Sequence, residues 1–378
     1  MNAYDVCVSG AGIVGRCLAL SLARQGLQVA LVPEARDVGR AAAGGDVRAY
    51  ALNAVSVGLL KRLKVWEALP EHVATAVHDM HIEGDAAGAG LSFSAWEQCV
   101  GELAWIVDAA VLEGHLADAV RFAPHLSVVP AGSEPAATLS ALCEGRASAS
   151  RSALGVRMER HDYGHRAIAA RLVAERPHLN RARQWFRVPD VLALLPLDTP
   201  EPGRSFALVW SLPDQQAEAL LALDAAAFEA ELLGATGGVS GGVVGALHLA
   251  SERAAWPLTF AHASTWCGPG WVLLGDAAHV VHPLAGPGLN LGLADVVALS
   301  KTIELREPWR ALGDEKLLRR YVRERSAPTW AMERVTDGLL QLFSSPQPAV
   351  QELRNRGLTL VDRVAPLKRW LAARALGS

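Results

Sequence analysis

The chain has 378 residues, 51% of them hydrophobic, and a formal net charge of −3 at pH 7. This length predicts two or three domains with sizeable cores, and the balanced charge gives no indication of a nucleic-acid partner. Five scattered cysteines without C-x-x-C spacing favour reduced thiols over a disulfide framework or a zinc site. With no basic leader and no long uncharged apolar run, we expect a cytoplasmic α/β protein that binds no metal.

The first predicted elements are a strand, a glycine turn, a helix and a second strand. The run YDVCVSGAGIVG leads into Gly10, Gly12 and Gly15, and RCLALSLARQG has helical spacing that ends at Gly26. Gly10 allows a tight bend, Gly12 lets a diphosphate approach the backbone, and Gly15 lets helix and strand pack closely. Because free N–H groups at a helix start bind phosphate, the segment predicts a dinucleotide site; an ordinary tight turn is the alternative.

The acid expected to bind a ribose does not stand at its usual place. Pro33 occupies the position near the end of the second strand, LQVALV, and Glu34 follows it. Successive side chains leave a strand on opposite faces, so Glu34 would point to the other face. Glu34 is therefore the candidate ribose ligand, one residue out of place.

The middle of the chain alternates apolar and polar residues in segments 76–99 and 159–263, which indicates antiparallel strands. The stretch QQAEALLALDAAAFEAELLG predicts one amphipathic helix ending at Gly234. Three tryptophans in or near these strands could line an aromatic pocket, with core packing as the alternative. They are Trp185, Trp210 and Trp256.

A second glycine turn follows the strand GWVLLGDAAH, which ends at Gly275 and Asp276. Ligands bind at the carboxyl ends of parallel strands, and Asp276 there can accept hydrogen bonds from sugar or ribityl hydroxyls. Capping of the following turn is the alternative role for this carboxylate. For His279 and His282, we favour hydrogen bonds that shape the turn over a catalytic role.

The loop HPLAGPGLN continues this turn into a helix. Pro283, Gly286 and Gly288 stiffen the loop and leave backbone N–H groups open, and the helix is expected to begin near Leu289 and Asn290. Its positive end would favour negative charge on a bound flavin.

Three blocks resemble the FAD-dependent aromatic hydroxylases of the para-hydroxybenzoate hydroxylase fold, in the branch that hydroxylates ubiquinone precursors. GAGIVGRCLALSLARQG resembles the first FAD motif of that family, and GDAAHVVHPLAGPGLNLGLADV resembles the second. The C-terminal stretch from TDGLLQLFSS to RWLAARALG is similar to the helical tail of the ubiquinone branch.

The resemblance implies an α/β fold in which a Rossmann-like FAD-binding domain is interleaved with an antiparallel β-sheet substrate domain, followed by C-terminal helices. The expected FAD-binding segments are 1–75, 100–158 and 264–300. The substrate domain would take 76–99 and 159–263, and 301–378 would be helical.

The resemblance also assigns residues. His282 and Pro283 would border the flavin ring, and Arg48 would lie near the flavin, although a solvated arginine at a helix start is the alternative. The flavin carries the chemistry, so no catalytic side chain is assigned. The implied cofactor-binding residues are Gly10, Gly12, Gly15, Glu34, Arg48, Gly275, Asp276, Pro283, Gly286, Gly288, Leu289 and Asn290.

The chain departs from the family pattern at several positions besides Pro33. Glu144 stands where the family has aspartate, Ala110 stands where it commonly has arginine, and the segment 125–143 is too short for the usual β-meander. These departures bear on FAD and nicotinamide binding, and they motivate a weakened or lost flavin affinity as an alternative.

The resemblance implies a monooxygenase that uses FAD, NAD(P)H and O2 to hydroxylate a phenolic ring, with a ubiquinone precursor as one candidate. A flavin-dependent reductase of a polyprenyl substrate is one alternative. The other is a non-catalytic, lipid-binding scaffold subunit in quinone biosynthesis. The basic and apolar tail LVDRVAPLKRWLAARALG could lie on the inner-membrane surface or pack on its own domain. The chain could also form a homodimer.

Overall fold

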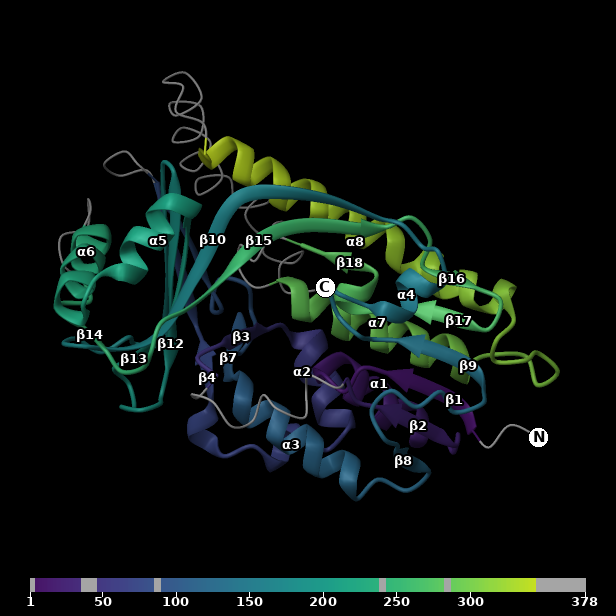
Figure 1. Ribbon diagram of the computed structural model, residues 1–378. Helices are drawn as coiled ribbons and strands as arrows, with labels where there is room; N and C mark the ends of the chain where they lie inside the picture. Colours follow the sequence, from purple (N-terminus) through teal and green to yellow (C-terminus); the bar gives the residue numbers. More distant parts are fainter. Residues whose placement is uncertain (1–3, 35–45, 85–89, 238–242, 282–286, 345–378) are drawn as a thin grey trace.

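The computed structural model describes residues 4–34, 46–84, 90–237, 243–281 and 287–344. A mainly parallel sheet, a large antiparallel sheet and a small sheet between them make up the described chain (Figure 1). This confirms the expected fold class: a Rossmann-like domain interleaved with an antiparallel domain, with helices toward the C-terminus.

The parallel sheet has the strand order β16-β17-β9-β1-β2-β8, in which only β16 runs antiparallel to its neighbour. Its central strands are buried on both faces, which explains their continuous apolar sequences. The link from β8 to β9 is eight residues, 129–136, so no meander lies between them. The strands are β1 (Tyr4–Ser9), β2 (Val29–Val32), β8 (Leu126–Val128), β9 (Ala137–Leu142), β16 (Cys267–Gly268) and β17 (Trp271–Leu273).

Helices pack against this sheet and share one hydrophobic core with it. The helix α7 contacts α1, α2 and α8, which brings the first and last thirds of the chain together (Figure 1). The helices are α1 (Ile13–Ala23), α2 (Ala54–Arg62), α3 (Ala109–Arg121), α4 (Ala149–Ala153), α7 (Pro287–Glu304) and α8 (Glu315–Ser344). Short 3₁₀ turns are η2 (Trp66–Ala68), η3 (Glu71–Val73) and η4 (Gly275–Ala277).

The large sheet has nine strands in the order β18-β15-β10-β13-β12-β11-β5-β6, with β14 also paired to β10. All its pairs are antiparallel except β11 with β5. The strands are β5 (Asp79–Glu83), β6 (Gly90–Ser94), β10 (Met158–Ala174), β11 (Arg181–Arg187), β12 (Asp190–Leu197), β13 (Ser205–Pro213), β14 (Leu247–Leu249), β15 (Ala254–Ala263) and β18 (His279–Val280).

The three-stranded sheet β3-β7-β4 lies between the other two. Its strands are β3 (Ala49–Leu52), β4 (Ala74–Val77) and β7 (Ala104–Asp108). Side chains of β7 and β4, such as Ile106 and Val77, share a hydrophobic cluster with Ala182 and Ala207 of the large sheet. We call the face of the large sheet that carries Ala182 and Ala207 the inner face, because it looks toward the FAD-type domain.

The outer face of the large sheet is covered by two helices where one was expected. The helix α5 (Asp214–Ala222) ends at Leu223, which is extended, and α6 (Ala225–Gly237) begins after Asp224. The Asp224 carboxylate accepts a hydrogen bond from the Ala227 N–H, so it caps a new helix. The second helix also continues past Gly234, which was expected to end it.

The tryptophans divide between the two faces. Trp185 and Trp210 belong to the outer hydrophobic cluster beneath α5 and α6, so core packing holds for both. Trp256 lies opposite Ala167 of β10, on the inner face, and is only partly buried.

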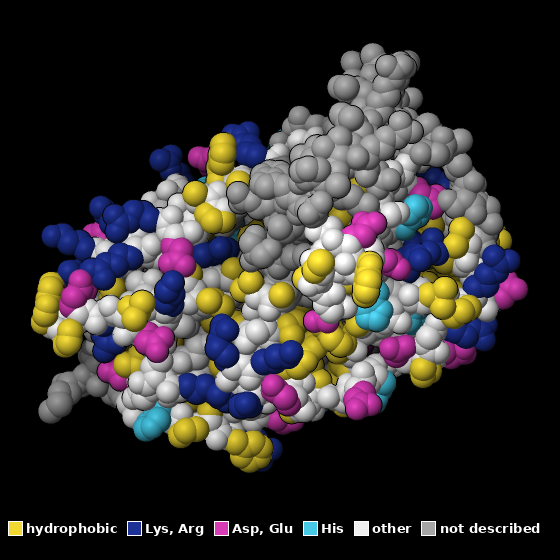
Figure 2. Space-filling view, turned by 180° about the vertical axis from the view of Figure 1, so that it is seen from behind, with side chains coloured by type: hydrophobic (Ala, Val, Ile, Leu, Met, Phe, Trp, Pro, Cys, Tyr) yellow, Lys and Arg dark blue, Asp and Glu magenta, His cyan; other side chains and the backbone are white. Residues whose placement is uncertain are grey.

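The molecular surface in Figure 2 shows charged side chains of both signs interspersed with hydrophobic ones. This distribution agrees with the small net charge of the chain.

Candidate cofactor-binding site

The first glycine turn joins β1 to α1 and leaves no room for side chains. A Cβ at Gly10 would lie 2.4 Å from the Cys143 carbonyl oxygen, and φ at Gly10 is +101°. A Cβ at Gly15 would lie 1.9 Å from the Gly10 carbonyl oxygen. Both positions therefore require glycine, as the motif predicts.

Gly12 of the same turn is different, because a Cβ there would meet no atom within 4 Å. It is the N-cap residue of α1, and within the described chain no side chain caps this helix and no acid lies in its first turn. The first N–H groups of α1 therefore face open space with no anion to satisfy them. A diphosphate fits this position by charge and by size.

The second glycine turn follows β17 and reaches the first one. Only β9 separates β17 from β1 in the sheet, and all three strands are parallel, so both turns lie at the same edge. A Cβ at Gly275 would lie 3.4 Å from Val14 Cγ2, in the first turn of α1. The two turns thus meet at Val14, which is the geometry that a single extended cofactor requires.

A buried ionic network holds the second turn. The Asp295 carboxylate of α7 accepts hydrogen bonds from the Gly275 N–H (3.0 Å) and from Arg325 Nε of α8 (2.8 Å), and pairs with His279 Nε2 (2.6 Å). Asp295 and His279 are at most 1% exposed. His279 therefore shapes the turn, as the sequence interpretation favoured.

Burial alone would raise the pKa of Asp295, but the opposing effect of His279 and then Arg325 lowers it below the usual value. The Tyr321 hydroxyl adds a second tie from α8, because it donates to the Leu273 carbonyl at 3.0 Å. The helix α8 is thus hydrogen-bonded to β17 through Tyr321 and, through Arg325 and Asp295, to the second glycine turn.

Asp276 lies in η4, just after Gly275, and its side chain is 41% exposed. Its only ion pair among the described residues is with Arg146 Nε at 3.3 Å, and Arg146 is 45% exposed. Such an exposed pair is weak, so the Asp276 carboxylate can exchange it for a ligand hydroxyl.

Glu144, which replaces the family's aspartate, follows β9 between the two turns. Its carboxylate accepts hydrogen bonds from Ser148 Oγ (2.6 Å) and from the Ser150 N–H (3.1 Å). The extra methylene thus directs the acid to the start of α4.

Arg151 was not singled out from the sequence, but it is 2% exposed and donates to the carbonyls of Ala277 (3.0 Å) and Arg146 (3.0 Å). Burial lowers its pKa. It therefore joins the segment after β9 to the second turn. The second of two arginines in the polar run GRASASRS carries no sequence signal of this role.

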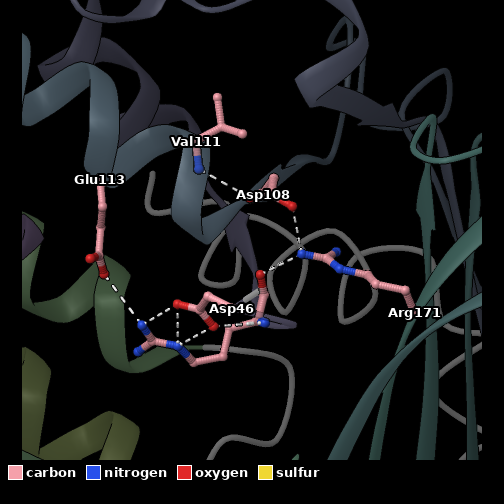
Figure 3. Close-up of polar contacts among 6 residues, drawn as sticks. Asp46, Asp108, Val111, Glu113 and Arg171 are labelled. Carbon is pink, nitrogen blue, oxygen red and sulfur yellow. Dashed lines mark hydrogen bonds and ion pairs between the residues drawn. The ribbon is translucent and has the colours of Figure 1, made fainter. Parts of the chain in front are cut away.

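Arg48 lies before β3 in a cluster of charged side chains (Figure 3). Its Nε donates to Asp46 at 2.8 Å, and its Nη2 lies 3.3 Å from Glu113 Oε1. The hydrogen bond to Asp46 is the main cause of a raised pKa for Arg48. With two carboxylates around it, Arg48 is neither bare nor simply solvated, and its contact with a flavin stays a prediction.

Arg171 of β10 extends from the inner face of the large sheet into the same cluster (Figure 3). Its Nη2 donates to the Arg48 carbonyl (2.6 Å) and to Asp108 Oδ2 (2.8 Å). Asp108 also caps α3 by accepting from the Val111 N–H. Arg171 therefore links the large sheet to the FAD-type domain by hydrogen bonds. No sequence motif indicated this role.

The helix α7 begins at Pro287, two residues earlier than expected, and carries three of the predicted cofactor residues. The Asn290 amide is engaged elsewhere: it donates to the Ala51 carbonyl and accepts from Ser56 Oγ. Leu289 packs against the core. Any cofactor contact at these two positions, and at Gly288, would therefore be made through the backbone.

Four other positions near the cofactor are predicted from the sequence. Glu34 follows β2 and is half-buried at the sheet edge that carries both turns. His282, Pro283 and Gly286 lie outside the described residues, so their predicted place at the flavin ring stays a prediction.

Comparison with known proteins identifies the family. A family model described as "FAD binding domain" matches residues 106–336. The ubiquinone hydroxylase UbiL of Rhodospirillum rubrum is 30% identical, over 99% of this chain and 90% of its own length. The chain belongs to the FAD-dependent aromatic hydroxylases.

A second relative of this hydroxylase is the 3-demethoxyubiquinol 3-hydroxylase of Escherichia coli, with 30% identity over 99% of this chain and 98% of the relative. Two solved structures share the fold. PqsL of Pseudomonas aeruginosa has a TM-score of 0.76 at 21% identity and covers 94% of this chain and 99% of its own. The p-nitrophenol 4-monooxygenase PnpA of Pseudomonas putida has a TM-score of 0.77 at 16% identity, over 99% and 98% of the two chains.

Proposed function

We propose that this FAD-dependent monooxygenase hydroxylates the aromatic ring of a ubiquinone precursor, with NAD(P)H as reductant. The observation that carries the site assignment is the meeting of the two glycine turns at Val14, on one edge of the parallel sheet. The names of the two 30%-identical relatives support the substrate class.

In this proposal, different residues bind different parts of FAD. The open N-terminus of α1 at Gly12 would hold the diphosphate, Glu34 the ribose, and Asp276 the ribityl hydroxyls. Backbone N–H groups at Gly288 would face the flavin ring. The bound FAD supplies the redox and oxygen chemistry, so no side chain has to act as nucleophile or metal ligand.

The chain's own contribution is to position, desolvate and stabilise. The start of α7 would present its positive end to the negative charge that a bound flavin gains on reduction. Arg146, now paired with Asp276, is a cation at the second turn, whereas Ala110 of α3 carries no charge. The inner face of the large sheet would cover the reacting ring and keep water from it.

We further propose that the enzyme meets its polyprenyl substrate at a membrane surface. Trp309 and Trp330 are 75% and 55% exposed, and each ring lies under an arginine, Arg310 and Arg334 respectively. Arg310 is 12% exposed and pairs with Glu307 and Asp314, whereas Arg334 is exposed. Exposed tryptophans, and an exposed arginine beside one, favour the headgroup level of a membrane. The basic C-terminal tail lies outside the described residues. No helix among the described residues has the length and apolar content needed to span a bilayer.

The test of the proposed function is titration of the purified protein with FAD, followed by NAD(P)H oxidation with prenylated phenols. We expect a yellow protein and a product that has gained one oxygen atom. A product that has gained two hydrogens would favour a polyprenyl reductase. A colourless protein that takes up no added FAD would favour a non-catalytic scaffold and overturn the proposal.

A further inference from the structure

Among the described residues, the inner face of the large sheet differs between its end and its centre. Near β4 and β7 its side chains pack into a hydrophobic cluster that includes Ala182 and Ala207. Toward the centre of the sheet, Ala193, Val209 and Trp256 remain partly exposed, although they lie in interior strands. The centre of the inner face therefore keeps some accessible surface on the side that looks toward the FAD-type domain.

Strand pairing places two polar side chains on this part of the inner face. Gln184 of β11 lies opposite Ala193 of β12, and Ala193 lies opposite Val209 of β13. Ser211 is two residues after Val209 and opposite Ala167 of β10. Because paired residues, and residues two apart on a strand, share a face, Gln184 and Ser211 both belong to the inner face.

Both residues are largely buried, but their polar atoms are not among the fully buried, unpaired ones. Gln184 is 8% exposed and Ser211 is 5% exposed. Across the described parts of the chain, neither side chain forms a hydrogen bond or an ion pair. Buried amides and hydroxyls are normally hydrogen-bonded, because leaving them unpaired is unfavourable. The polar atoms of Gln184 and Ser211 escape this penalty because they still reach solvent, so a ligand on the inner face can take the place of water there.

We propose that Gln184 and Ser211 are specificity-determining residues that bind a neutral oxygen substituent of the substrate ring. This inference rests on the proposed hydroxylation of an aromatic ring. Both side chains donate and accept hydrogen bonds and neither carries charge, which matches a phenol hydroxyl, a methoxy group or a quinone carbonyl.

A carboxylate would need a free cation on this face. Arg171, the cation of the inner face of β10, is 2.8 Å from Asp108 and bonded to the Arg48 carbonyl. Its charge is therefore paired with Asp108, although its buried Nη1 has no partner among the described residues. Ala193 and Val209 remain partly exposed beside these two residues, where a flat ring with an apolar tail could lie.

The stability of two variants separates this role from a structural one. If Gln184 and Ser211 serve to bind a ligand, Gln184→Leu and Ser211→Ala remove an amide and a hydroxyl that have no hydrogen-bond partner among the described residues. The melting temperature of the ligand-free protein should then stay constant or rise. A clear fall in either variant, or failure of both to fold, would show a structural role and overturn the inference.

The binding test uses the FAD-loaded full chain and two probes that differ by one hydroxyl group, 2-allylphenol and allylbenzene. Calorimetric titration of the wild type should give a dissociation constant about tenfold lower for the phenol, as one well-made hydrogen bond predicts. Gln184→Leu and Ser211→Ala should each reduce this ratio to about threefold or less, mainly by weakening phenol binding. Gln216→Leu, at an exposed position of α5, is the matched control and should keep the tenfold ratio.

The outcomes distinguish this inference from the proposed function. An unchanged ratio in both stable variants, or a wild type that does not discriminate the two probes, overturns the assignment of Gln184 and Ser211. Hydroxylation of prenylated phenols by the same wild-type preparation would leave the proposed function standing in either case. Absence of any hydroxylated product would overturn the proposed function by itself.

Discussion

The two glycine turns of the cofactor site are stabilised by opposite means. The first turn depends on missing side chains, because a Cβ at Gly10 or Gly15 would collide with backbone oxygens. The second depends on buried charges, with Asp295 joining Gly275, His279 and Arg325. The contact at Gly15 lies within the first fifteen residues, and the contact at Gly10 involves Cys143 just after β9. The second turn is instead held by side chains of α7 and α8.

Among these variants, Asp295→Asn should lower the folding stability most, and it tests the second turn. The substitution leaves Arg325 buried beside a neutral amide, which typically destabilises a protein by about 3–5 kcal/mol. Denaturant unfolding measures the loss. The exposed Asp118→Asn on α3 is the control and should change stability by less than about 0.5 kcal/mol. An Asp295→Asn protein as stable as the wild type would show that the second turn does not depend on the buried charges.

The contribution of Asp295 to stability should also depend on pH in one direction. Its pKa is lowered in the folded state, so its stabilising effect is fully present above the unfolded-state pKa of about 4. It is lost as the pH falls from about 4 through the lower folded-state pKa. The stability difference between wild type and Asp295→Asn should therefore shrink below about pH 4. A difference that grows with acid would contradict the assigned direction.

Gly15→Ala and Gly12→Ala test the first turn as a pair. Gly15→Ala forces a methyl group against the Gly10 carbonyl and should cost about 1–3 kcal/mol of folding stability. Gly12→Ala meets no atom and should cost less than about 1 kcal/mol. It should nevertheless weaken FAD binding at least about tenfold, because its methyl group occupies the diphosphate position. Thermal unfolding and FAD titration measure the two effects, and equal effects of both variants on stability would contradict this division.

Asp276→Asn should have the smallest effect on stability. It loses an exposed ion pair with Arg146, which contributes roughly 0–1 kcal/mol. If Asp276 binds the ribityl chain, FAD affinity should still fall several-fold. Unaltered FAD binding in this variant, with Asp118→Asn as the reference, would remove Asp276 from the cofactor site.

The sequence predicted the strand–turn–helix at the N-terminus well, because glycine spacing and strand hydrophobicity act within one short segment. It also predicted antiparallel strands in the middle of the chain from alternation of period two. It missed the break between α5 and α6, since the capping role of Asp224 is visible only once Leu223 is seen to be extended. The boundaries assigned to the interleaved segments remain expectations.

What the sequence determined by itself was the fold class, the family and the two turns, because each depends on residue types at short spacing. The tertiary structure alone decided which partners the charged residues take and which face each strand residue occupies. Arg325 reaches Asp295, and Arg171 reaches Asp108, across tens of residues of chain. Alternation along a strand separates two faces but does not say which one packs against the helices. Only the packed sheets place Trp210 in the outer hydrophobic cluster and Gln184 on the inner face.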